Sequence, residues 1–413
     1  MVDLHGYKYL ISTEFMKKPL KYRIPYGKHY IDEEDIAAVV NVLKYKNLTQ
    51  GEEVEKFEKA VAKFVGAKYA VAVSSWTSGL HLANLVLGVM EGDKVVTSPI
   101  TFVATSNSVL YCGAKPVFSD IDSSTINICP EELENTIIEN PSIKVIIPVH
   151  FAGLSCDMES INRIAKKYDL CIIEDAAHAL GAKHHDGSMV GSCKYSDMAG
   201  FSFHPVKSIA AGEGGMITTN NEVLYRKLLR LRSHGINKLN DDFIFHENSK
   251  TNDIANPWYY EMQDLGYNYR ITDIQCALGK SQLNKLDSFI EKRKYLANRY
   301  DKAFFKNTLI NPIQKDYRSI SSHHLYVVRI KFKELKITKA ELMNRLEDLE
   351  IGTQVHYIPV MNHPFYKNLK YTNNEYKNSM NFYDECLSLP LYYSLSDEDQ
   401  DYVIHNLNNL IKN

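Results

Sequence analysis

The chain has 413 residues, of which 45% are hydrophobic and 24% charged, and its formal net charge at pH 7 is −2. This length allows one large domain with a smaller companion, and the composition is ordinary for a soluble globular enzyme. The balance of 48 basic and 50 acidic residues argues against a nucleic-acid-binding protein. No apolar run approaches the roughly 20 residues that a membrane helix needs.

Two features bear on the compartment. Residues 1–21 lack the apolar core and the small-residue cleavage site of a signal peptide. The seven cysteines are scattered and never spaced as a CxxC pair, so we expect reduced thiols, with neither a disulfide framework nor a bound metal. Together these features predict a cytoplasmic protein.

The first half of the chain alternates helices with short apolar runs. Asp32 can cap a helix with apolar residues from Ile36 to Leu43, and a second amphipathic helix fits Glu52–Val65. The candidate strands that follow are Tyr69–Val73, Lys94–Ser98, Lys115–Ser119, Val145–Val149, Leu170–Glu174 and Met198–Phe203. The helices expected between them include Thr101–Tyr111, Pro130–Glu139 and Met158–Tyr168. This order predicts an α/β protein with a mixed, mostly parallel sheet and helices on both faces.

After a further strand, Met216–Thr219, the pattern changes. The polar stretch Asn237–Asn256 is typical of a surface loop or insertion, and one long helix is predicted from Asp273 towards Tyr300. Later elements are sparser and indicate a small α+β domain. The predicted organisation is an N-terminal extension (1–21), a large cofactor-binding domain (22–270), and a long helix with a small C-terminal domain (271–413).

The strongest local signal is the stretch Phe201–Lys207, which is followed by Gly212-Glu213-Gly214-Gly215. A lysine that forms a Schiff base must be held beside its carbonyl partner with its amine partly unprotonated. A strand that ends in a glycine-flanked turn can hold Lys207 in this way. A solvated surface lysine after a strand remains an alternative for this stretch alone.

A second signal places an acid at the end of a buried apolar strand, in Ile172–His178. Open α/β sheets bind ligands at such strand ends. Asp175, ionised and buried there, would need a cationic partner, and a protonated pyridine nitrogen is one. An acidic helix N-cap is the alternative reading.

Two weaker signals lie at the ends of the preceding strands. Ser74–Leu80 offers hydroxyls and free N–H groups at a helix start, which suit a phosphate, although plain capping is common there. Phe102 follows the next strand and could cover one face of a flat ring, or pack in a core. A phosphate cradle, a stacking aromatic, an acid and a lysine occur in that order. Together they form the set of groups that pyridoxal phosphate (PLP) requires.

The chain from about Tyr22 onward resembles the DegT/DnrJ/EryC1/StrS sugar aminotransferases, which have the fold type I of PLP enzymes. The stretches that carry the resemblance are Ile24–Gly27, Leu48–Gly51, Phe201–Lys207, Glu213–Gly215, Arg232–Gly235, His324–Tyr326, Gln354–Tyr357 and Leu387–Pro390. The resemblance implies that Lys207 and Asp175 are catalytic: Lys207 would carry PLP and move a proton to carbon four of the sugar. It implies further cofactor contacts by Thr77, Ser78, Phe102, His178, Ser202 and Asn268.

The resemblance also implies a homodimer with two shared active sites, in which Asn268 reaches the phosphate of the neighbouring subunit. Its weaker implications are substrate contacts by Arg270, His324, His356 and Tyr357, with His323 and His363 as further candidates. Two departures stand out. Trp76 occupies a position where relatives usually have glycine or alanine, and the stretch from Gly235 to Asn268 is longer than usual.

The activity implied is transamination of a nucleotide-linked 4-keto-6-deoxy sugar with L-glutamate as amino donor. The last three stretches resemble members of pseudaminic acid biosynthesis. They imply UDP-2-acetamido-2,6-dideoxy-β-L-arabino-hexos-4-ulose as acceptor and UDP-4-amino-4,6-dideoxy-N-acetyl-β-L-altrosamine as product.

Three alternatives remain open at this point. One is another 4-keto sugar of the family, linked to UDP in the D configuration, to GDP or to dTDP. Another is a PLP-type dehydratase, although such relatives have histidine in place of the lysine. The third is a non-catalytic regulatory relative, against which the intact Lys207, Asp175 and Phe102 argue.

Overall fold

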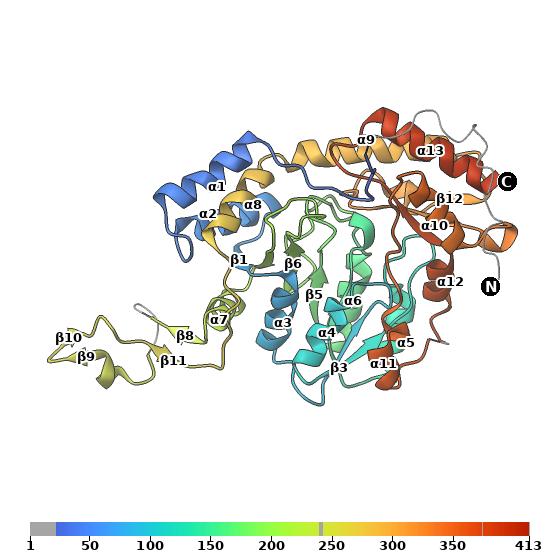
Figure 1. Cartoon of the computed structure of the whole chain (residues 1–413). Coiled ribbons are helices and arrows are strands. Elements are labelled where there is room, and N and C mark those ends of the chain that lie inside the picture. Colours follow the sequence, from blue (N-terminus) through green and yellow to red (C-terminus); the bar gives the residue numbers. More distant parts are fainter. Residues whose placement is uncertain (1–21, 239–242, 374, 413) are drawn as a thin grey trace, which may run out of the picture.

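The centre of the computed structural model is a seven-stranded mixed sheet (Figure 1). The structure describes residues 22–238, 243–373 and 375–412. The strands are β1 (Tyr69–Val73), β2 (Lys94–Thr97), β3 (Lys115–Phe118), β4 (Ile143–Ile147), β5 (Cys171–Asp175), β6 (Met198–Ser202) and β7 (Gly215–Thr219), in the order β1-β7-β6-β5-β4-β2-β3. Only β7 runs antiparallel to its neighbours. The predicted mixed, mostly parallel sheet is confirmed.

Helices cover both faces of this sheet because successive strand residues point to opposite sides. Ile173 packs in the core beneath α3 (Trp76–Val86), α4 (Ala104–Tyr111) and α7 (Glu222–Arg232), whereas Ile172 packs beneath α5 (Pro130–Glu139) and α6 (Met158–Tyr168). α5 and α6 have the predicted bounds. α4 begins three residues later than predicted, because Thr101–Val103 form part of a cavity wall instead.

The first helix, α1 (Glu33–Tyr45), is capped by Asp32 as predicted: its side chain accepts from the N–H groups of Glu34 and Asp35. α2 (Glu52–Val65) buries its apolar stripe against the sheet. α1 instead leaves much of its apolar face uncovered, since Ile36 is 47% and Leu43 56% exposed. An uncovered apolar helix face indicates a surface for a partner.

The single long helix predicted from Asp273 is wrong, because the structure has two helices there. α8 (Asp273–Leu283) packs on α1 and α2, and α9 (Leu286–Phe304) continues into the small domain. The break holds Lys285 against the acidic start of α1, with its Nζ 2.6 Å from Asp32 Oδ1 and 2.8 Å from Asp35 Oδ2. The chain therefore changes direction between the two cores at this ion-paired lysine.

The small domain is built on an antiparallel sheet of β12 (Ile310–Pro312), β13 (Tyr326–Ile330) and β14 (Cys386–Leu389). Its helices are α10 (Lys339–Asp348), α11 (Pro364–Asn368), α12 (Lys377–Glu385) and α13 (Asp397–Lys412). One core joins α9, α10 and α13 to this sheet, and Ile24 from the beginning of the described chain packs into it. In the described residues no helix is both long and apolar enough to cross a bilayer.

The polar stretch predicted after residue 237 lies in an arm that projects from the body next to α7 (Figure 1). The arm contains β8 (Ile236–Asn237), β9 (Lys250–Thr251), β10 (Ile254–Ala255) and β11 (Glu261–Met262). Ile254, Met262 and Leu265 are more than 60% exposed, so this arm is another candidate contact surface. The predicted extension 1–21 lies outside the described residues, as do residues 239–242 of the polar stretch.

Candidate active site

A cavity of about 660 Å³ lies where the loops after β2, β5 and β6 meet the start of α3 and the small domain. It brings together most of the predicted site residues, namely Thr77, Phe102, Asp175, His178, Ser202, Lys207, His324, His356, Tyr357 and His363. Ser78, Asn268, Arg270 and His323 do not line it. The strand ends therefore converge on one site, as ligand sites of open α/β sheets do.

The start of α3 is held in a fixed turn by two serines. Ser75 Oγ accepts from the Ser78 N–H at 3.1 Å, and Ser78 Oγ donates to the Ser75 carbonyl at 2.7 Å. Ser78 is thus engaged in capping, whereas Thr77 and Ser202 face the cavity. The first N–H groups of a helix have no partner within it and favour anions. This corner suits a phosphate group.

Asp175 is buried at the end of β5 and accepts three hydrogen bonds. Trp76 Nε1 donates to Oδ1 at 2.7 Å, the Ala177 N–H donates to Oδ1 at 3.3 Å, and Thr105 Oγ1 donates to Oδ2 at 2.7 Å. Donors of this kind stabilise an ionised carboxylate. Asp175 can therefore face a cationic ring nitrogen from the cavity wall.

Lys207 lies in the turn that follows β6, where its backbone N–H donates to the His204 carbonyl at 2.8 Å. Burial lowers the pKa of its amine to about 8, although the charge of Asp175 opposes this shift. An amine with that pKa is neutral in roughly a tenth of molecules at pH 7, about 300 times the share of an ordinary lysine. Lys207 is therefore prepared to attack a carbonyl carbon.

Three neutral histidines border the cavity: His178 lies in the loop after β5, and His324 and His356 come from the last third of the chain. Burial lowers the pKa of His178 and His324 well below the usual value, and that of His356 to about 3. His178 Nδ1 accepts from the Ala152 N–H at 3.3 Å, so its proton lies on Nε2, 3.0 Å from Tyr357 Oη. The Tyr357 hydroxyl proton is then available to a ligand.

The buried histidines predict a loss of stability in acid. The pKa is lowered in six of them, namely His81, His178, His184, His323, His324 and His356. Below pH 6.5 the unfolded chain binds protons that the folded chain does not, so each such residue lowers the unfolding free energy by about 1.4 kcal/mol per pH unit. Urea midpoints should therefore fall steeply from pH 7 to pH 5.

A matched pair of variants separates the buried histidines from the exposed ones. His178→Gln should flatten the acid slope by about one proton, whereas His185→Gln should leave it unchanged because His185 is exposed. Equal slopes in both variants would contradict the assignment of a buried neutral ring to His178.

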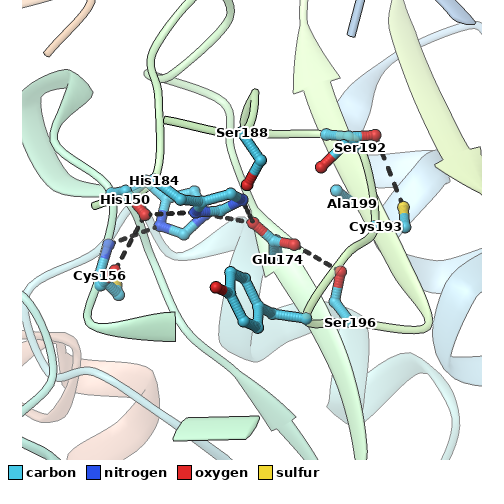
Figure 2. Close-up of polar contacts among 12 residues, drawn as sticks. His150, Cys156, Glu174, His184, Ser188, Ser192, Cys193, Ser196 and Ala199 are labelled. Carbon is cyan, nitrogen blue, oxygen red and sulfur yellow. Dashed lines mark hydrogen bonds and ion pairs between the residues drawn. The ribbon is translucent and has the colours of Figure 1, made fainter. Parts of the chain in front are cut away.

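Figure 2 shows the polar groups around Glu174, a residue of β5 that does not line the cavity. Glu174 is fully buried, with Oε2 2.7 Å from His150 Nε2, and Ser196 Oγ donates to its Oε1. Burial raises the pKa of Glu174, but these hydrogen bonds and the neighbouring histidines hold it below its usual value. The Cys156 N–H donates to His150 Nδ1 at 3.0 Å. The network ties the loop after β4 to the strand end that carries Asp175.

Sequence reasoning missed two residues that contact the site acid, Trp76 and Thr105. In the sequence Trp76 stands out only as a departure in the phosphate loop, and Thr105 lies three residues after Phe102 at the start of α4. The spacing of Thr101, Phe102 and Thr105 was the available signal, because residues three or four apart share one side of a helical turn. The Trp76 contact spans 99 positions, and no local pattern reveals it.

The chain matches the profile of the DegT/DnrJ/EryC1/StrS aminotransferase family over residues 29–408. It is 41% identical over 392 residues to the spore coat polysaccharide biosynthesis protein SpsC of Bacillus subtilis (strain 168). That alignment covers 94% of this chain and 97% of SpsC. It is 40% identical over 391 residues to the UDP-4-amino-4,6-dideoxy-N-acetyl-beta-L-altrosamine transaminase of Campylobacter jejuni (serotype O:23/36, strain 81-176), covering 94% and 98%.

Solved structures show the same likeness. Helicobacter pylori PseC, an aminotransferase involved in the biosynthesis of pseudoaminic acid, superposes with a TM-score of 0.86 at 33% identity, covering 94% of this chain and 99% of that chain. The PLP form of the putative sugar aminotransferase Spr1654 from Streptococcus pneumoniae has a TM-score of 0.84 at 30% identity, covering 95% and 99%. The likeness therefore extends over almost the whole chain.

Proposed function

The chain belongs to the DegT/DnrJ/EryC1/StrS aminotransferase family, and we propose that it transfers the amino group of L-glutamate to carbon four of a UDP-linked 4-keto-6-deoxy sugar. It is a PLP-dependent sugar aminotransferase. The proposed acceptor is UDP-2-acetamido-2,6-dideoxy-β-L-arabino-hexos-4-ulose, and the proposed compartment is the cytoplasm. The observation that supports this acceptor is the 40% identity, over 94% of this chain, to the Campylobacter transaminase named for the aminated sugar.

The described residues fit PLP. Lys207 faces the cavity, and within the described part of the chain no group hydrogen-bonds its amine. Phe102 stands 59% exposed in the wall, where it can cover a ring. Thr77 and Ser202 would hold the phosphate, with Ser78 supporting that turn, and His178 would lie beside the ring hydroxyl. Bound there, PLP supplies a ring that accepts electrons from the carbon bonded to the amine nitrogen.

The reaction then rests on two side chains with different tasks. Asp175, whose carboxylate accepts three hydrogen bonds, would pair with the pyridine nitrogen. Lys207 would hold the cofactor through its amine, and the same amine would carry a proton to carbon four of the sugar. Because one amine delivers this proton from one side, it sets the configuration of the new amine.

The sugar would meet the wall opposite the sheet. Tyr357, His324, His356 and His363 all line it, and the free Tyr357 hydroxyl proton is a donor for a sugar oxygen. The neutral rings of His324 and His356 can each accept or donate a hydrogen bond without adding charge. The nucleotide diphosphate, held farther out, would supply binding energy that positions the ketone.

We also propose a homodimer with shared sites. Asn268 is exposed at the base of the arm and does not line the cavity of its own chain. It is therefore free to reach a neighbouring subunit, and Arg270 beside it is the weaker candidate for a substrate anion. The uncovered apolar residues of α1 and of the arm are the surfaces that such a dimer would bury.

The substrate is tested by giving the enzyme each candidate 4-keto sugar with L-glutamate. We expect kcat/KM for the UDP-linked L-arabino ketone to exceed that of the D-configured UDP-sugar and of GDP- and dTDP-linked ketones by more than about tenfold, roughly 1.4 kcal/mol in transition-state binding. Mass spectrometry of the aminated products gives the rates. A tenfold preference for any of the other ketones would overturn the substrate and leave the aminotransferase activity standing.

A further inference from the structure

The indole of Trp76 lies in a space that two glycines leave open. Trp76 is the first residue of α3, and its side chain is buried against β6. A Cβ placed on Gly200 would come within 1.8 Å of indole Cζ3, and one on Gly79 within 2.6 Å of Cε3. An alanine at either position would therefore push the ring from its place. The ring is fitted to this position from both sides.

This position directs the indole N–H at a carboxylate. Nε1 donates to Asp175 Oδ1 at 2.7 Å. A buried indole needs an acceptor for its N–H, and a backbone carbonyl would serve as well. Here the acceptor is instead the carboxylate of Asp175, which lines the cavity. The bond therefore acts on a site residue as well as on the packing of the core.

Counting lone pairs shows which oxygen of Asp175 remains free. Oδ1 accepts from Trp76 and from the Ala177 N–H, so its two sites are filled. Oδ2 accepts from Thr105 alone and keeps one site. The Thr105 proton is committed to Asp175, so Thr101 Oγ1, 2.7 Å away, donates to Thr105 and holds it in turn.

We propose that Trp76 is a positioning residue, which fills Oδ1 of Asp175 and fixes the carboxylate so that Oδ2 alone meets the pyridine nitrogen of PLP. The inference rests on the role proposed above for Asp175. With Trp76 in place, Oδ1 is occupied and the carboxylate is held in one orientation. Without the indole donor, the carboxylate would be free to rotate, and Oδ2 would no longer be held towards the ring nitrogen.

The test compares two cofactors that differ only at the ring nitrogen. PLP and its carbocyclic analogue, in which a C–H replaces that nitrogen, are titrated into apoenzyme and followed by absorbance. Trp76→Phe should raise the dissociation constant of PLP about tenfold and that of the analogue less than twofold. Trp258→Phe is the matched control, since Trp258 is the other tryptophan and is 71% exposed. It should change neither constant.

A second replacement keeps the shape of the ring. In the Trp258→Phe chain, incorporation of benzothienylalanine replaces only Trp76 and puts sulfur where the N–H was. It should reproduce the Trp76→Phe result even if the smaller phenyl ring disturbs folding. Equal weakening of both cofactors, or unchanged binding of PLP, would overturn the positioning role.

Asp175→Asn distinguishes the proposal for Trp76 from the proposed pairing of Asp175 with the ring nitrogen. If it weakens PLP selectively and the Trp76 variants do not, Asp175 keeps its role and the proposal for Trp76 falls. If Asp175→Asn weakens both cofactors equally, the pairing of Asp175 with the ring nitrogen is itself wrong, and the proposal for Trp76 falls with it.

Discussion

Replacing Lys207 by alanine is expected to lower turnover by more than about a thousandfold, because in the proposed reaction the same amine tethers the cofactor and carries the proton. The amine is suited to both tasks: it lines the cavity, and burial lowers its pKa to about 8. Borohydride should fix PLP to the wild-type chain at Lys207 and leave the variant unlabelled, as read by absorbance and peptide mass spectrometry.

Lys183→Ala is a suitable control, since Lys183 is exposed and does not line the cavity. It should retain both turnover and the bound-cofactor absorbance. More than a small percentage of wild-type activity in Lys207→Ala would show that another group moves the proton. Lys207 would then be no more than a residue near the ring.

The positions of Lys207 and Asp175 could be predicted from the sequence because Asp175 ends one buried strand and Lys207 follows the next. β5 and β6 are parallel neighbours, so their carboxyl ends meet at one edge of the sheet and bring the two residues to one cavity. Phe102 and Thr77 follow for the same reason. Strand ends can be recognised from the local sequence, and a parallel sheet brings the residues at those ends together at one edge.

The contacts that tune the site depend on residues far apart in the chain. His178 bonds Tyr357 across 179 positions, and Trp76 bonds Asp175 across 99. The break between α8 and α9 likewise depends on Lys285 meeting Asp32 and Asp35. Helical periodicity continues through that break, so the pattern predicted one helix where tertiary ion pairs make two.

The exposed apolar face of α1 also shows that a sequence pattern predicts a helix without predicting its tertiary contacts. Its periodicity predicted the helix correctly, with Asp32 as cap. Such a pattern is usually taken to mark the face that meets the chain's own core, yet Ile36 and Leu43 remain exposed in the single chain. Amphipathicity predicts the helix, and it does not say how much of the apolar face meets the chain's own core.

Mixing two inactive variants is expected to restore activity if the sites are shared. Lys207→Ala removes the lysine of a chain's own site, and Asn268→Asp places a negative charge where the phosphate of the partner's site would be approached. A heterodimer then has one site with both residues intact and one with neither, so half of its sites, or about a quarter in a statistical mixture, should work.

The readout is turnover per subunit in co-expressed chains carrying different affinity tags, purified through both tags in succession. The separately expressed variants are the baseline and should stay inactive. Exposed Asn268, outside its own cavity, is what makes rescue the expected result. If Asn268 instead served the site of its own subunit, each site of the heterodimer would carry one of the two substitutions. Both sites would then be inactive. A monomer by light scattering, or silent heterodimers of proven composition, would refute the shared site, and Asn268 would then need a role within its own chain.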